Sequence, residues 1–211
     1  MTQRTLARVS LVFVMFAAAA GTASARQVSA PQLSQAERDA AVKHLQETRE
    51  NFLKSIADLS DAQWTFKAGP DRWSIAEVAE HIAVSESTVL GLINDKIMKA
   101  PPVAKDPAGP TDAKVIAAVT DRSQKAQAPE MLKPTNRYTT REALTKDFMT
   151  SRDRTIDYVK TTAEDLRGHS APHPALKTID GYQWVLLLSA HSARHTAQID
   201  EVKASAGYPG K

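Results

Sequence analysis

The amino-acid sequence predicts an all-α protein: a four-helix bundle with a long crossover connection between its second and third long helices. Four long segments carry apolar residues at steps of three and four, which is the spacing of an amphipathic helix. No segment of any length alternates apolar and polar residues as a strand would, and no internal repeat is present. Six of the eleven prolines fall within residues 99–138. Because proline interrupts helices, that span must be a connection, and its length lets the helix after it run parallel to the helix before it.

Residues 1–25 have the features of a secretory signal peptide. Arg4 and Arg8 precede an almost wholly apolar run at residues 9–20, and Ala23-Ser24-Ala25 is a small-residue cleavage site. The apolar run is too short for a stable membrane-spanning helix. We therefore predict a periplasmic or secreted protein.

The predicted mature chain is a single domain covering residues 31–207, with cleavage after residue 30 and an uncleaved anchor as the alternatives. Nothing after residue 30 is apolar for long enough to span a bilayer. Removal of residues 1–25 leaves 25 basic and 24 acidic residues, a balance that does not indicate nucleic-acid binding. The absence of cysteine excludes disulfides and thiolate chemistry.

Each long helix is predicted to begin at a side chain that can cap it, with an acidic or amide side chain three residues later. The pairs are Ser34 and Glu37, Ser74 and Glu77, Thr139 and Glu142, and Asp180 and Gln183. With the apolar periodicity, they predict long helices at about 34–59, from 74 to the proline-rich span, from 139 or 140 to about 162, and at 180–206. A shorter helix at about 111–125 fits between the proline clusters, and residues 60–72 and 163–178 are predicted to be irregular.

The last helix carries the main functional clue. Positions 184, 188, 191, 195, 198 and 202 form one stripe on it, and His191 and His195 lie on that stripe. Four residues apart on a helix, their Cβ atoms are about 6 Å apart on one face, close enough to bind one metal ion together. The pair alone is a weak motif, since Ser192 stands where a zincin has its glutamate.

A third ligand is needed, and His81 near the core face of the second long helix is the candidate. Three neutral imidazoles would hold zinc, nickel or a similar divalent ion and leave one or more positions for water. We interpret His44 as a solvated helix residue. The pair His169 and His173 is interpreted as a coincidence in a loop, because neighbouring prolines prevent the helix that would align them.

Two further polar residues are candidates to orient the ligands from behind. Glu86 occupies a place on the apolar stripe of its helix, and Gln198 follows His195 by three residues. The alternative is that Glu86 is solvated and that Gln198 only covers the polar end of the bundle.

Most of residues 34–205 resemble the DinB-like (YfiT-like) four-helix bundle proteins. The resemblance is sharpest at Trp73-Ser-Ile-Ala-Glu-Val-Ala-Glu-His81-Ile and at His191-Ser-Ala-Arg-His195-Thr-Ala-Gln198-Ile. It implies a divalent metal site made by His81, His191 and His195. Some relatives are metal-dependent thiol S-transferases, one branch includes a maleylpyruvate isomerase, and many have no known reaction. The leader and the proline-rich span depart from the compact family pattern, so the resemblance does not specify a substrate.

Two hypotheses of function follow from these residues together with the family resemblance, which is the source of the thiol S-transferase version. The first is an exported metal-dependent enzyme, a transferase (thiol S-transferase-like) or a hydrolase acting on a small molecule. The second is a non-catalytic metal-binding or stress-related bundle in which the metal is structural. Three ligands rather than four favour the enzyme, because structural zinc sites are usually closed by a fourth side chain. We expect no nucleic-acid partner and, after signal cleavage, no membrane, and the sequence leaves a homodimer open.

Overall fold

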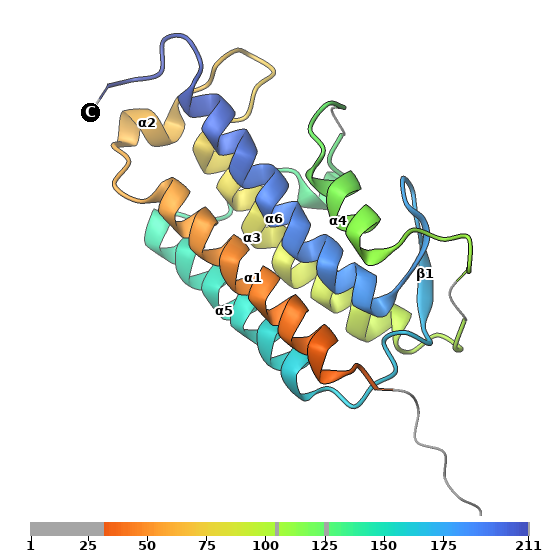
Figure 1. Cartoon of the computed structure of the whole chain (residues 1–211). Coiled ribbons are helices and arrows are strands. Elements are labelled where there is room, and N and C mark those ends of the chain that lie inside the picture. The colour runs from red at the N-terminus through yellow and green to blue at the C-terminus, as the bar shows by residue number, and fades with distance from the viewer. Residues whose placement is uncertain (1–31, 104–105, 125–126, 211) are drawn as a thin grey trace, which may run out of the picture.

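The computed structural model describes residues 32–103, 106–124 and 127–210. These residues form the predicted all-α four-helix bundle (Figure 1). Its long helices are α1 (Gln35–Ile56), α3 (Ile75–Leu92), α5 (Arg141–Thr161) and α6 (Gly181–Lys203). The predicted signal peptide, residues 1–25, and both of its cleavage sites lie outside the described residues.

The long helices form a ring in which α1 and α3 each pack against both α5 and α6. The chain runs in one direction along α1 and α6 and in the opposite direction along α3 and α5 (Figure 1). The helices on either side of the proline-rich connection are therefore parallel, as the crossover prediction requires. Within the described part of the chain, no helix is long and apolar enough to cross a membrane.

Three capping predictions are confirmed and one is corrected. Reciprocal capping boxes begin α1, α3 and α6 at Ser34, Ser74 and Asp180. At the start of α5 the side chain of Thr140, and not that of Thr139, accepts the hydrogen bond from the third helical amide, at 3.1 Å from Ala143 N. The local sequence therefore determines where three of the four long helices begin, and it places the start of the fourth within one residue.

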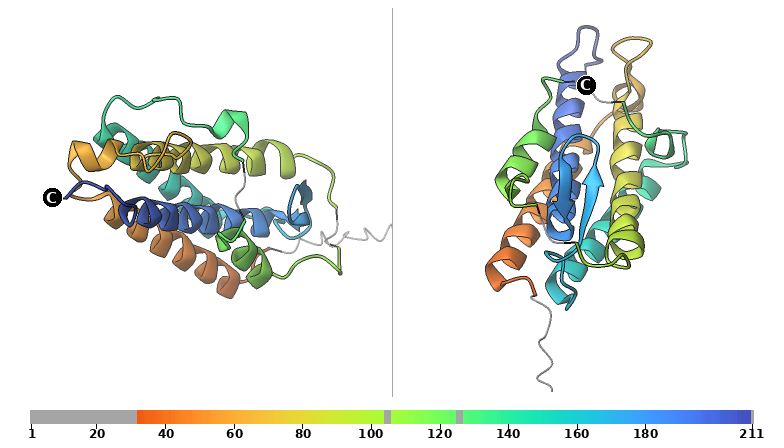
Figure 2. Two further views of the ribbon diagram at one scale, coloured as in Figure 1. Left: turned by 90° about the horizontal axis from the view of Figure 1, so that it is seen from above. Right: turned by 90° about the vertical axis from the view of Figure 1, so that its right-hand side faces the viewer.

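Shorter elements fill the connections. They are α2 (Asp61–Thr65), the π-helical turn η1 (Ile93–Ile97) that extends α3, α4 (Asp112–Thr120) and the 3-10 turn η2 (Glu130–Leu132). The helix predicted at 111–125 is thus shorter, because the backbone becomes extended at Asp121. α4 packs on α6, and the segment that follows it passes along α3 on its way to α5 (Figure 2).

The prediction that residues 163–178 are irregular was wrong at one place. β1 (Ser170–His173) and β2 (Lys177–Asp180) form an antiparallel hairpin that leads into the start of α6 (Figure 2). Four residues are too few for a clear alternation of apolar and polar side chains. The turn also needs a positive φ of 61° at Lys177. Lysine is not a residue type that indicates positive φ, so the sequence gives no sign of this turn.

A buried polar layer separates the core into two apolar clusters. One cluster surrounds Leu45 on α1, and the other contains Phe52 of α1 and Phe148 of α5, whose rings meet edge to face with centroids 4.6 Å apart. Between them, each long helix turns a buried polar side chain inward. These four residues, called the polar layer below, are Thr48 of α1, Glu86 of α3, Arg152 of α5 and Ser192 of α6.

Candidate metal centre

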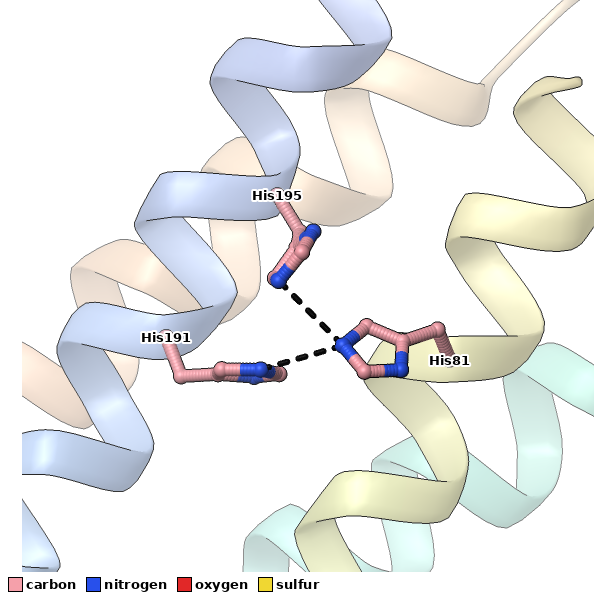
Figure 3. A group of neighbouring side chains, drawn as sticks. All are labelled: His81, His191 and His195. Atoms are coloured by element: carbon pink, nitrogen blue, oxygen red, sulfur yellow. Dashed lines mark hydrogen bonds between the residues drawn. The ribbon is translucent and has the colours of Figure 1, made fainter. Parts of the chain in front are cut away.

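Three histidine side chains converge between α3 and α6 (Figure 3). The Nε2 atom of His81 lies 3.1 Å from Nε2 of His191 and 3.2 Å from Nε2 of His195. His191 and His195 come from successive turns of α6, as the spacing predicts, and His81 faces them from the antiparallel neighbour. The structure therefore brings together all three of the residues that the sequence marked as ligands.

Two of the three imidazoles are oriented by a hydrogen bond at Nδ1, the ring nitrogen that faces away from the cluster. Nδ1 of His81 lies 2.8 Å from the main-chain oxygen of Leu132, and Nδ1 of His195 lies 2.8 Å from Oε1 of Gln198. A carbonyl oxygen only accepts hydrogen bonds, so both Nδ1 atoms carry the hydrogen and both Nε2 atoms carry a lone pair. Nδ1 of His191 is buried and, within the described residues, has no hydrogen-bond partner.

This donor set fits a divalent cation. The lone pairs of His81 Nε2 and His195 Nε2 face each other at 3.2 Å with no hydrogen between them, which is repulsive unless a positive charge lies close by. Ligands at 2.0–2.1 Å in tetrahedral directions around zinc would be about 3.3–3.4 Å apart, close to the distances seen here. The oxygen atoms that contact Nδ1 of His81 and of His195 also fit this role, since a metal-binding histidine usually donates its other N–H to such an outer partner.

The surroundings keep the imidazoles neutral. Burial lowers the pKa of His81, and burial together with the charges of His195 and His81 lowers the pKa of His191 well below its usual value. Burial and the charge of His81 lower the pKa of His195 to about 3. Because a histidine must be unprotonated to bind metal, these shifts keep the three nitrogens available at neutral pH.

The proline-rich connection contributes directly to the site, which the sequence did not reveal. Besides the Leu132 carbonyl on His81, main-chain amides of the same segment bind the buried carboxylate of Glu80, from Thr135 at 2.7 Å and from Arg137 at 3.3 Å. This segment is thereby fixed to the helix that carries His81. No sequence signal could have identified Leu132, since its main-chain oxygen is independent of the side chain.

Glu86 and Gln198 have different positions relative to the histidines. Gln198 contacts His195 as described above. Glu86 is fully buried, so the alternative that it is solvated is wrong. Its described hydrogen bonds go to Arg152 and Ser192 in the polar layer and not to a histidine. Sequence reasoning missed Arg152, although an arginine between Phe148 and Ile156 on an apolar stripe was a signal of the same kind as Glu86.

The other histidines lie away from this cluster. His44 is partly buried with Nδ1 3.2 Å from Ser189 Oγ, so it is less solvated than predicted, and it is not one of the clustered histidines. Nδ1 of His169 lies 3.3 Å from the main-chain oxygen of Ile97, and the ring of His173 packs edge-on against Trp184. Neither joins the three-histidine group.

Comparisons with known proteins agree with this fold. The family model of the DinB superfamily matches residues 44–199, which include all three histidines. The uncharacterized protein YuaE of Bacillus subtilis strain 168 is 24% identical over 157 residues, which cover 74% of this chain and 93% of YuaE. The structure of YfiT from Bacillus subtilis, described as a probable metal-dependent hydrolase with an unusual four-helix bundle topology, aligns with a TM-score of 0.55 at 15% identity. That alignment covers 84% of this chain and 92% of YfiT. The chain belongs to the DinB superfamily.

Proposed function

We propose that this protein is an exported, divalent-metal-dependent enzyme that acts on a small molecule as a hydrolase or a transferase. The proposal rests on the convergence of three neutral imidazoles. The Nε2 atoms of His191 and His195 lie 3.1 and 3.2 Å from the Nε2 atom of His81. The description of YfiT as a probable metal-dependent hydrolase supports the hydrolase version. The transferase version rests on the family resemblance, and export rests on the composition of residues 1–25.

The residues of this chain divide the work of the site. His81, His191 and His195 hold the ion, which we take to be zinc or nickel, because borderline divalent ions suit imidazole ligands. Leu132 and Gln198 fix the direction of two imidazoles through their Nδ1 atoms. A divalent ion bound there would lower the pKa of a coordinated water or substrate thiol toward neutrality. Three protein ligands leave a position for substrate.

Glu86 is not assigned the role of general base. Its carboxylate is fully buried and binds Arg152 through both oxygens. A base must reach the proton that it removes, and this carboxylate is instead oriented toward α5. Glu86 is therefore not placed to take part in proton transfer with a substrate.

A structural metal is the second candidate. The observation in its favour is that the three histidines join α3 to α6, so an ion bound there would hold two helices of the bundle together. A closed structural site and an open catalytic site differ in whether outside ligands can enter.

Cobalt substitution distinguishes the two candidates. We expect the visible spectrum of the cobalt-substituted protein to change with pH near neutrality and to change again when azide or a small thiol is added. The same titration on the His191→Ala variant is the control and should show neither change. A wild-type spectrum that is indifferent to pH and to added ligand would contradict the enzyme and favour the structural metal.

A further inference from the structure

Arg152 connects the two helices that carry the three histidines, although it lies on neither of them. Its guanidinium binds the carboxylate of Glu86 on α3 through Nε, at 2.9 Å, and through Nη2. Nη2 also donates to Ser192 Oγ on α6 at 2.8 Å, and that hydroxyl lies 3.3 Å from Glu86 Oε1. All three side chains are buried.

The guanidinium is also anchored to the remaining long helix. Its Nη1 donates to the main-chain oxygen of Leu45 at 2.6 Å and to Thr48 Oγ1 at 2.7 Å, both on α1. A guanidinium has five N–H donors in one rigid plane. Each of the five contacts a separate acceptor site, so Arg152 cannot rotate or shift without breaking hydrogen bonds inside the core.

The attachment points lie beside the proposed ligands. Glu86 is five residues after His81 on α3, and Ser192 directly follows His191 on α6. A slide or rotation of α3 against α6 would change the distances between the histidine nitrogens, and the same movement would break the bonds of Arg152. The network therefore constrains the relationship between helices on which the three-histidine cluster depends.

Stability alone is a poor explanation for such a network. A well-packed apolar pair often stabilises a core as well as a buried ion pair does, or better, because both charges must first lose their hydration. What a rigid polar network adds is a defined register between helices, and metal ligands need their geometry held by supporting residues.

We infer that Arg152 is a positioning residue for the metal centre, which sets the spacing of His81 against His191 and His195 through Glu86 and Ser192. This inference rests on the proposed function, since it presumes that the histidines bind metal. By this inference, the polar layer fixes the relative position of the two helices that carry the histidines.

The test measures cobalt affinity and the visible spectrum of the cobalt-loaded protein in three variants. Glu86→Leu/Arg152→Met removes both charges at once, so that no unpaired charge is left in the core. Ser192→Ala removes only the contact to α6. Arg38→Met is the matched control, because Arg38 is also a buried arginine but bonds the main-chain oxygens of Val159 and Thr162 at the α1–α5 contact.

We expect the double variant to bind cobalt on the order of 10–100-fold more weakly, the range typical for lost supporting contacts, and to show a changed spectrum. Ser192→Ala should weaken cobalt binding by a smaller factor and should change the spectrum in the same direction. Arg38→Met should keep wild-type affinity and spectrum even where its melting temperature falls, so a loss of stability cannot imitate the result.

Wild-type affinity and spectrum in Ser192→Ala and in the folded double variant would overturn the inference and leave the proposed function standing. If the double variant does not fold, Ser192→Ala decides in the same way. A wild-type protein that binds no cobalt would instead refute the proposed function on which the inference rests.

Discussion

The Nδ1 atom of His81 lies 2.8 Å from the main-chain oxygen of Leu132, 51 residues further along the chain. The carbonyl accepts the imidazole hydrogen and so leaves the opposite nitrogen, Nε2, directed at His191 and His195 (Figure 3). Amides of Thr135 and Arg137 on Glu80 hold the same segment in place. The long connection thus orients a proposed ligand, beyond joining two parallel helices.

Substitution of any one of the three clustered histidines should release the metal. We expect His81→Ala, His191→Ala and His195→Ala each to weaken divalent-metal binding by about 100-fold or more, since loss of an outer partner alone costs 10–100-fold. Elemental analysis of the purified proteins measures this. The controls His44→Ala, His169→Ala and His173→Ala should retain wild-type metal content, and equal loss in both sets would refute the assignment.

Gln198 should support metal binding through His195. Its Oε1 is 2.8 Å from Nδ1 of that residue, so Gln198→Ala should weaken metal affinity by about 10-fold. Gln198→Glu keeps an acceptor at that place, and a carboxylate makes the imidazole a stronger ligand, so this variant should match or exceed the wild type. Competition titrations with a chromophoric chelator give both values. Equal affinities in all three proteins would show that the contact has no effect on the metal.

Loss of Arg152 alone should destabilise the fold strongly. Arg152→Met leaves the buried carboxylate of Glu86 without its partner, which should lower the free energy of unfolding by about 3–5 kcal/mol. The double variant Glu86→Leu/Arg152→Met should recover most of that loss, and urea denaturation measures both.

The surface pair between Arg49 and Asp153 provides the matched comparison. Its carboxylate side chain is 56% exposed, so Arg49→Ala should cost less than about 1 kcal/mol. If Glu86→Leu and Arg152→Met lowered the free energy of unfolding additively, the two buried side chains would not be coupled as we describe.

Chelation should leave the bundle folded. The two apolar clusters are built mainly from aliphatic and aromatic side chains of all four long helices, such as the contacting rings of Phe52 and Phe148, and these contacts do not depend on an ion. We therefore expect the helical circular dichroism signal to survive chelator. Metal should raise the melting temperature, with a stabilisation of about 2.7 kcal/mol at a free concentration 100 times the Kd. Collapse of the helical signal on chelation would instead indicate that metal binding is part of folding.

The signal-peptide prediction concerns residues outside the described structure and is tested separately. Expression of the full precursor should give a mature chain that begins at Arg26, or at Pro31 if the alternative site is used. Intact-mass measurement on periplasmic protein identifies the first residue. Retention of Met1 in a cytoplasmic pool would contradict export.

The sequence by itself determined the four long helices and two of the three clustered histidines. Capping depends on side chains three residues apart, so Ser34, Ser74 and Asp180 mark their helix starts without knowledge of the fold. The four-residue spacing of His191 and His195 likewise places both on one helix face. To identify His81 as the third member required two further observations, its position near the core face of its helix and the family resemblance. The reason is that its partners lie on another helix.

Only the tertiary structure decided what surrounds those histidines. The Leu132 oxygen is a main-chain atom, so no residue type marks it, and its approach to His81 depends on the path of a long connection. The sequence showed that Glu86 was unusual but not that it binds Arg152, because that pairing depends on the register between α3 and α5. Helical periodicity fixes which side chains of one helix point inward, but the partner that each one meets is set by how the helices pack.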